Sequence, residues 1–123
     1  SLHDALPISR VGKIQDILIE VNIGEEDSKS GIAPKQLLPL LQEIAVYPHL
    51  HVKGLMTIPP AGENEKFLSK MQDLYLDIRS KNVDNIDMDI LSMGMSDDYV
   101  KAIQYGATLV RIGSALFGAR VYQ

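Results

Sequence analysis

Two stretches of this chain end an apolar run in a turn of glycine and serine, the pattern of a phosphate-binding corner. The first is 91–98, with the sequence LSMGMSDD, and the second is 110–118, with the sequence VRIGSALFG. In each, the apolar residues predict a buried strand, and the turn leaves backbone N–H groups at the carboxyl end of that strand. Because neighbouring parallel strands place their carboxyl ends side by side, the two stretches predict one shared site for a phosphate group.

The second stretch carries the residues best suited to a charged ligand. Gly113 allows the backbone to approach a ligand closely, and the Ser114 hydroxyl can cap a helix or donate to a phosphate oxygen. Arg111 interrupts the apolar run, and a guanidinium in a core strand needs a carboxylate or a ligand nearby. In the first stretch, Ser96 also fits the N-cap of a helix, so a structural role for Ser96 stays open.

Composition and charge argue against several classes of protein. The chain has 123 residues, of which 46% are hydrophobic, enough for one domain with a core. A net charge of −4 without a clustered basic stripe argues against nucleic acid as a partner. No apolar run is long enough to span a membrane, no signal peptide is recognisable and cysteine is absent, so we expect a cytoplasmic protein. His49 and His51 are expected at the surface, not on a metal.

Strand-like and helical stretches alternate along the chain, which is the order expected of parallel βα units. The expected strands are 16–23, 51–58, 88–92 and 108–112, and the expected helices are 34–46, 64–80, 97–105 and a short one from 114. Pro34 suits the first position of its helix, whereas Pro39 removes a backbone donor and is expected to kink or delay that helix.

Four βα units make half of an eightfold barrel, which usually takes about 250 residues. The predicted fold class is therefore α/β, a (β/α)8 TIM barrel of which this chain holds about the C-terminal half. A small open sheet of four strands is the alternative. Residues 1–9, SLHDALPIS, resemble a translated sequencing-library adapter, so we expect residues 10–123 to be the native half-barrel.

Five ordered motifs resemble those of the pyridoxal phosphate homeostasis proteins, and the resemblance covers residues 12–122. The motifs are EVNI at 20–23, SKSGI at 28–32, GLMTIP at 54–59, LSMGMSDD at 91–98 and VRIGSALFGAR at 110–120. The resemblance implies a barrel like the N-terminal domain of alanine racemase that binds pyridoxal 5′-phosphate (PLP). It also implies intracellular storage or delivery of PLP without robust catalysis.

Carried over by motif, the resemblance assigns PLP to the two corners. The turn at Ser96, together with Gly113 and Ser114, would hold the phosphate, and Arg111 would face the pyridine nitrogen. Because arginine keeps its proton, a ring nitrogen that accepts from it stays unprotonated and is a poor electron sink. The full set of expected PLP contacts is Met95, Ser96, Arg111, Ile112, Gly113 and Ser114, with Lys29 and Asn22 as further candidates.

No catalytic residue is assigned in this chain. In the resembled family the lysine that forms the Schiff base lies on the first barrel strand, upstream of the motif at 20–23, and nothing here corresponds to it. Lys53 begins a strand, the wrong end for a barrel site. Lys29 follows a strand at the correct end, where it is either a ligand contact or a solvated loop lysine.

Two other functions stay open beside PLP homeostasis. One is a PLP-dependent amino-acid racemase, which would need a second base from a further, mostly β domain. The other is a barrel fragment that binds a different phosphorylated metabolite, since barrels commonly hold phosphate after their last two strands. For the full-length parent we expect PLP as the small-molecule partner, no nucleic acid, no membrane, and a monomer or weak dimer.

Overall fold

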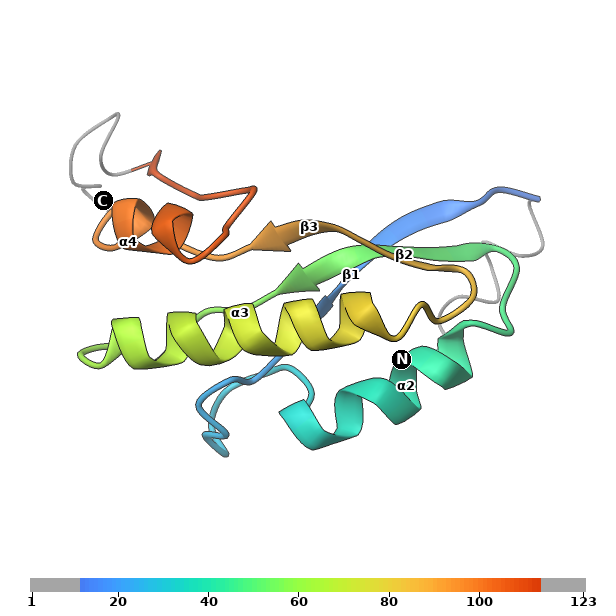
Figure 1. The fold of residues 1–123 in the computed structure, drawn as a ribbon, viewed down its shortest axis with the longest axis horizontal. Coiled ribbons are helices and arrows are strands. Elements are labelled where there is room, and N and C mark those ends of the chain that lie inside the picture. The colour runs from blue at the N-terminus through green and yellow to red at the C-terminus, as the bar shows by residue number, and fades with distance from the viewer. Residues whose placement is uncertain (1–11, 114–123) are drawn as a thin grey trace, which may run out of the picture.

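A parallel three-stranded sheet forms the frame of the structure, a computed structural model that describes residues 12–113 (Figure 1). The strands are β1 (Gln15–Glu20), β2 (Leu50–Met56) and β3 (Ile86–Ser92), hydrogen-bonded in the order β1-β2-β3. Both pairings are parallel, so the predicted α/β class with a parallel sheet is confirmed. Residues 1–9, Ser114 and the helix expected from 114 lie outside the described residues.

Each connection between strands passes through a helix, as parallel pairing requires. The first connection contains a 3-10 turn, η2 (Pro34–Gln36), followed by α2 (Leu37–Ile44), and the second contains α3 (Asn64–Ser80). A short helix, α4 (Tyr99–Gln104), follows β3. Figure 1 shows α2 and α3 on the same side of the sheet, with α4 beyond the end of β3.

The predicted strand 108–112 is reduced to a single parallel bridge between Ser92 and Leu109. The segment still runs beside the end of β3, because Met93 N–H donates to the Leu109 carbonyl at 3.1 Å. Within the described residues, this segment has a neighbour on one side only and makes few ladder bonds. The described sheet therefore has three strands, and residues 12–113 do not confirm the expected count of four βα units.

Helix α3 has its predicted bounds, whereas α2 and α4 are shorter than the predicted helices 34–46 and 97–105. The 3-10 turn delays α2 until Leu37, which places Pro39 in the first turn of the helix. Because N–H groups of the first turn have no partner within a helix, proline costs little there. Of the two effects expected of Pro39, the structure shows the delay.

The hydrophobic core lies between the sheet and the helices α2 and α3. Its buried residues recur at spacings of three and four along both helices, so each helix buries one face. The main members are Leu37, Leu41 and Ile44 from α2, Leu68, Met71, Tyr75 and Ile78 from α3, and Leu50, Val52, Leu55, Met88 and Leu91 from the sheet. The methionine and tyrosine of α3 are therefore core residues, as their spacing predicts.

The opposite face of the sheet carries charged side chains near the amino ends of the strands. His51 Nε2 lies 2.6 Å from Asp87 Oδ2, and His51 Nδ1 lies 3.4 Å from Asp16 Oδ1, so one imidazole spans three strands. Within residues 12–113, no group of three or more potential metal ligands is found. Among the described helices, none is long and apolar enough to cross a membrane.

Two contacts fix the position of the middle strand. A Cβ added at Gly54 would lie 1.8 Å from the Ile90 carbonyl oxygen, so β2 and β3 approach closely only because Gly54 has no side chain. At the carboxyl end of β2, the fully buried Thr57 hydroxyl donates to the Val21 carbonyl at 2.6 Å. The carboxyl ends of β1 and β2 are therefore held together by a side chain as well as by the sheet.

Replacing Thr57 with valine should lower the free energy of unfolding by about 1–3 kcal/mol, because the Val21 carbonyl then stays buried without its partner. Urea denaturation followed by circular dichroism measures this loss. Ser80→Ala is the matched control, since Ser80 Oγ donates to the Asp77 carbonyl at the exposed end of α3. The control should change the free energy by less than about 0.5 kcal/mol, and equal losses in both variants would contradict the prediction.

Candidate functional site

The turn after β3 and the segment after Leu109 form two adjacent corners at one end of the sheet. Arg111 N–H donates to the Gly94 carbonyl at 2.9 Å, which adds to the bond between Met93 and Leu109. Residues 93–98 and 109–113 therefore lie side by side, as expected for the ends of neighbouring parallel strands. That these corners bind a ligand stays a prediction.

Gly94 allows the two corners to approach each other. Its φ is +103°, and an added Cβ would lie 2.6 Å from the Ala102 side chain and 3.2 Å from Val110 Cγ1. A larger residue would therefore push the turn away from α4 and from the second corner. Gly94 was not among the predicted site residues, although the glycine in the turn MGMS was an available signal.

Arg111 lies in the second corner, where its backbone N–H donates to the Gly94 carbonyl beyond the end of β3. Its neighbour Val110 packs against the core. The Arg111 Nη2 atom is buried and has no hydrogen-bond partner among the described residues. Because an unpaired buried polar group is costly, this guanidinium fits the acceptor atom of a ligand. The sequence predicted a carboxylate or a ligand here, and the described residues bring no carboxylate to this atom.

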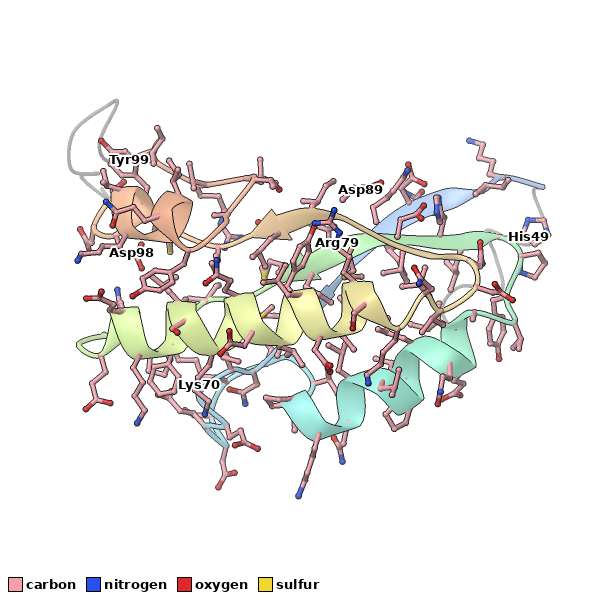
Figure 2. The ribbon with its side chains drawn as sticks, viewed as in Figure 1. His49, Lys70, Arg79, Asp89, Asp98 and Tyr99 are labelled. Carbon is pink, nitrogen blue, oxygen red and sulfur yellow. The ribbon has the colours of Figure 1, made fainter. Side chains whose placement is uncertain are left out.

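Asp98 closes the turn of the first corner (Figure 2). Asp98 Oδ1 accepts the Met95 N–H at 2.7 Å, and the Met95 carbonyl accepts the Asp98 N–H at 3.1 Å. The backbone bond closes a turn over residues 95–98, and the Asp98 side chain holds the amide at the start of that turn. Asp98, not Ser96, is the residue that precedes α4, so the alternative of Ser96 as the N-cap of this helix is wrong. The Met95 N–H already has a partner in Asp98, so it is not one of the amides that the turn leaves for a ligand.

The second corner is described as far as Gly113. Ile112 is half-buried and Gly113 is exposed. A Cβ added at Gly113 would meet no atom within 4 Å, so packing among the described residues does not require glycine at this position. Ser114, the expected phosphate contact that follows, lies outside the described residues.

The two further candidates, Asn22 and Lys29, lie in the loop after β1. Asn22 Nδ2 donates to the Glu26 carbonyl at 2.7 Å, and Asn22 Oδ1 accepts the Glu26 N–H at 3.2 Å. Asn22 therefore shapes its own loop, in which Lys29 is exposed. No hydrogen bond or ion pair within the described part of the chain joins either residue to the two corners. Lys53 lies in the middle of β2, not at its beginning as predicted, and its Nζ is 3.7 Å from Asp89 Oδ2.

The start of α3 holds α4 and the first corner in place. Asn64 Nδ2 donates to Asp98 Oδ2 at 2.9 Å. Glu65 Oε1 accepts the Tyr105 hydroxyl at 2.8 Å, and Glu65 Oε2 lies 3.4 Å from Lys101 Nζ. The Tyr105 hydrogen bond, assisted by Lys101, lowers the pKa of Glu65. Sequence reasoning missed these positioning residues because their partners are distant along the chain.

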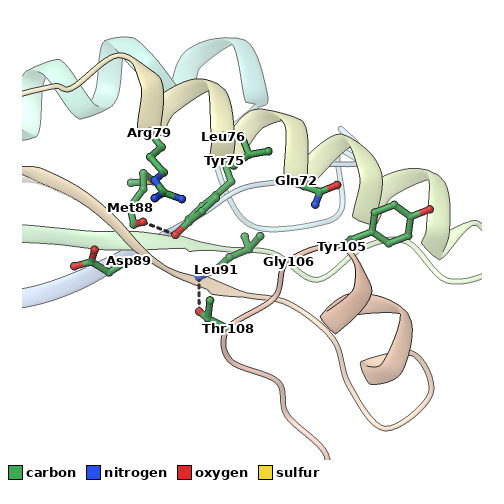
Figure 3. A pocket seen from close by; sticks show the side chains of 10 residues that line it. All are labelled: Gln72, Tyr75, Leu76, Arg79, Met88, Asp89, Leu91, Tyr105, Gly106 and Thr108. Carbon is green, nitrogen blue, oxygen red and sulfur yellow. Dashed lines mark hydrogen bonds between the residues drawn. The ribbon is translucent and has the colours of Figure 1, made fainter.

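A cavity of about 380 Å³ lies outside the two corners, between α3, β3 and residues 105–108 (Figure 3). Side chains here bond backbone groups at the edge of β3, because the Tyr75 hydroxyl donates to the Met88 carbonyl and Thr108 Oγ1 accepts the Leu91 N–H. None of the predicted site residues lines this cavity. We therefore place the candidate site at the corners.

Comparison with known proteins agrees with the fold. The family model described as the N-terminal domain of alanine racemase matches residues 3–121. The pyridoxal phosphate homeostasis protein of Pasteurella multocida is 45% identical over 111 residues, which cover 87% of this chain and 47% of that protein. The chain thus spans about half the length of the curated relatives it matches.

Solved structures show the same arrangement. PipY of Synechococcus elongatus, solved without PLP, has a TM-score of 0.79 at 26% identity. The match covers 89% of this chain and 53% of the PipY chain. The same protein solved with PLP bound has a TM-score of 0.75 at 24% identity, and the match covers 90% of this chain and 52% of the PipY chain. Alanine racemase of Corynebacterium glutamicum has a TM-score of 0.69 at 16% identity, and the match covers 94% of this chain and 32% of the racemase chain. The last two comparisons show the fold alone.

Because the pKa of Glu65 is lowered in the folded state, its ionised form stabilises the contact between α3 and α4. This stabilisation is present above the ordinary pKa of glutamate and is lost as the pH falls through the lowered value. A 13C NMR titration should give the Glu65 carboxyl a midpoint below that of glutamate in an unstructured peptide. In Tyr105→Phe the midpoint should rise, because the largest cause of the shift is removed. A midpoint that does not move would show that the tyrosine bond is not formed.

Proposed function

This chain belongs to the alanine racemase N-terminal domain family, and we propose on that premise that it binds PLP and serves in intracellular PLP homeostasis. The observation that carries the proposal is the buried Arg111 Nη2, which lacks a partner among the described residues and belongs to one of two adjacent corners. Relatives at 45% and 41% identity named pyridoxal phosphate homeostasis protein support it.

The residues at the corners fit this cofactor. The turn at Ser96 and the residues Gly113 and Ser114 would hold the phosphate, and Arg111 would donate to the pyridine nitrogen. When bound, PLP supplies an electrophilic aldehyde. Because Arg111 does not release its proton, it would leave the ring nitrogen unprotonated and would disfavour chemistry that needs a strong electron sink. Such a site holds the cofactor better than it activates it, which agrees with storage or delivery.

The other expected contacts with PLP are not all equally well supported. Met95 and Ile112 belong to the corners themselves, and the Met95 amide is engaged by Asp98. Asn22 and Lys29 would reach the cofactor only from the loop after β1, where Asn22 already bonds Glu26. We keep these two residues as secondary candidates.

The parallel sheet with helices on one side supports a wider proposal, that the chain forms part of a (β/α)8 barrel whose interior receives the corners. A cytoplasmic location and a monomeric or weakly dimeric protein belong to the same proposal. The alternative function, a PLP-dependent racemase, is not favoured, because the likeness to alanine racemase shows the fold alone.

The protein, expressed at the full length that its gene encodes, should take up PLP and show the visible absorbance of the bound cofactor. The same preparation should racemise alanine no faster than PLP free in solution, because the proposal assigns it no catalysis. Absorbance titration and a chiral assay of alanine measure the two properties. A preparation that stays colourless in saturating PLP would contradict the proposed function, and rapid racemisation would favour the enzyme.

Arg111→Gln and Ser114→Ala should have separable effects on bound PLP. Arg111→Gln should shift the absorbance maximum, because the donor to the ring nitrogen changes. Ser114→Ala should leave the spectrum unchanged and weaken the affinity by roughly tenfold to a hundredfold, the cost of one hydrogen bond to a charged group. Arg79→Gln is the matched control for the arginine, since Arg79 lines the cavity away from the corners. An unchanged spectrum in Arg111→Gln would count against the contact with the ring nitrogen.

A further inference from the structure

Asp98 is the acidic residue bonded directly to the backbone of the first corner. We propose that Asp98 is a positioning residue that fixes the shape of this corner and, through its charge, limits the affinity for phosphate so that the cofactor can leave. The inference rests on the proposed function, because it concerns the same phosphate site.

Both carboxylate oxygens of Asp98 have partners that define the turn. Oδ1 accepts the Met95 N–H at 2.7 Å, and Oδ2 accepts from Asn64 Nδ2 at 2.9 Å. Asn64 is the first residue of α3, so Asp98 connects the helix after β2 to the turn after β3. Helix α4 has six residues, too few to orient the turn alone, and the two bonds to Asp98 supply that orientation.

Among the ion pairs of residues 12–113, none involves Asp98. Its two side-chain partners are a backbone amide and a carboxamide, which are neutral. The lysine of α4, Lys101, lies against Glu65 instead. A phosphate held at the turn around Ser96 would therefore lie near an uncompensated negative charge, and two anions at short range repel. A protein that stores and releases its cofactor gains a faster release rate from such a charge.

The contact with Asn64 allows the positioning role of Asp98 to be tested separately from the effect of its charge. Its Oδ1 atom is buried and has no hydrogen-bond partner among the described residues, while its Nδ2 is bonded to Asp98. In Asp98→Asn, the new carboxamide can still accept the Met95 N–H, and its nitrogen can donate to Asn64 Oδ1 after a rotation of the Asn64 amide. This variant therefore keeps the turn and removes the charge, whereas Asp98→Ala removes both.

The test compares the binding of PLP and of inorganic phosphate to the protein at the full length that its gene encodes. Asp98→Asn should bind both ligands roughly threefold to tenfold more tightly, and PLP should dissociate more slowly by a similar factor. The gain should shrink as salt is added, because ions screen the repulsion. Asp98→Ala should bind more weakly than Asp98→Asn. Asp97→Asn is the matched control for an exposed neighbouring charge and should show a smaller gain.

Hydrogen exchange of the Met95 amide in the ligand-free protein reports the turn independently of PLP. The amide should be protected in the native protein and in Asp98→Asn, and it should exchange at least about tenfold faster in Asp98→Ala. If the native protein binds PLP but Asp98→Asn binds no more tightly, or Asp97→Asn gains as much, the role of the Asp98 charge is overturned. An equally protected Met95 amide in Asp98→Ala would overturn the positioning role. Failure of the native protein to bind PLP would instead overturn the proposed function.

Discussion

The hydrogen bond from the Arg111 N–H to the Gly94 carbonyl is the contact on which the candidate site depends. It continues the parallel pairing of β3 beyond the end of the strand and so places two turns side by side. The bond needs Gly94, whose positive φ and missing side chain bring the turn against α4 and Val110. The position of the polar groups at the corners therefore depends on close packing of the backbone at Gly94.

The hydrophobic core fixes the corners by fixing the strands. α2 and α3 cover one face of the sheet, and their buried leucines leave little freedom for the strands to slide. The start of α3 then reaches across to α4 through Asn64 and Glu65, so the helix that supports the core also supports the first corner. The stability of the core and the position of the first corner therefore both depend on α3.

Local patterns were enough to predict part of this arrangement from the sequence. The bounds of α3 follow from the regular spacing of its apolar residues, and the parallel sheet follows from the alternation of strands and helices. The segment 108–112 was not predicted correctly, because ladder formation depends on neighbours that a single segment does not contain. The bonds of Asp98 to Met95 and Asn64 were missed for two reasons: the first is a turn detail, and the second joins residues far apart along the chain.

The close approach of β2 and β3 at Gly54 has a consequence for the way sites are found in this fold. Any side chain there would displace the Ile90 backbone and so disturb β3, the strand that leads to the turn carrying Ser96. Natural variation should therefore be as narrow at Gly54 as at residues that touch a ligand. A survey that ranks positions only by invariance would score this mid-sheet glycine as a binding residue, although its role is to allow the close approach of β2 and β3.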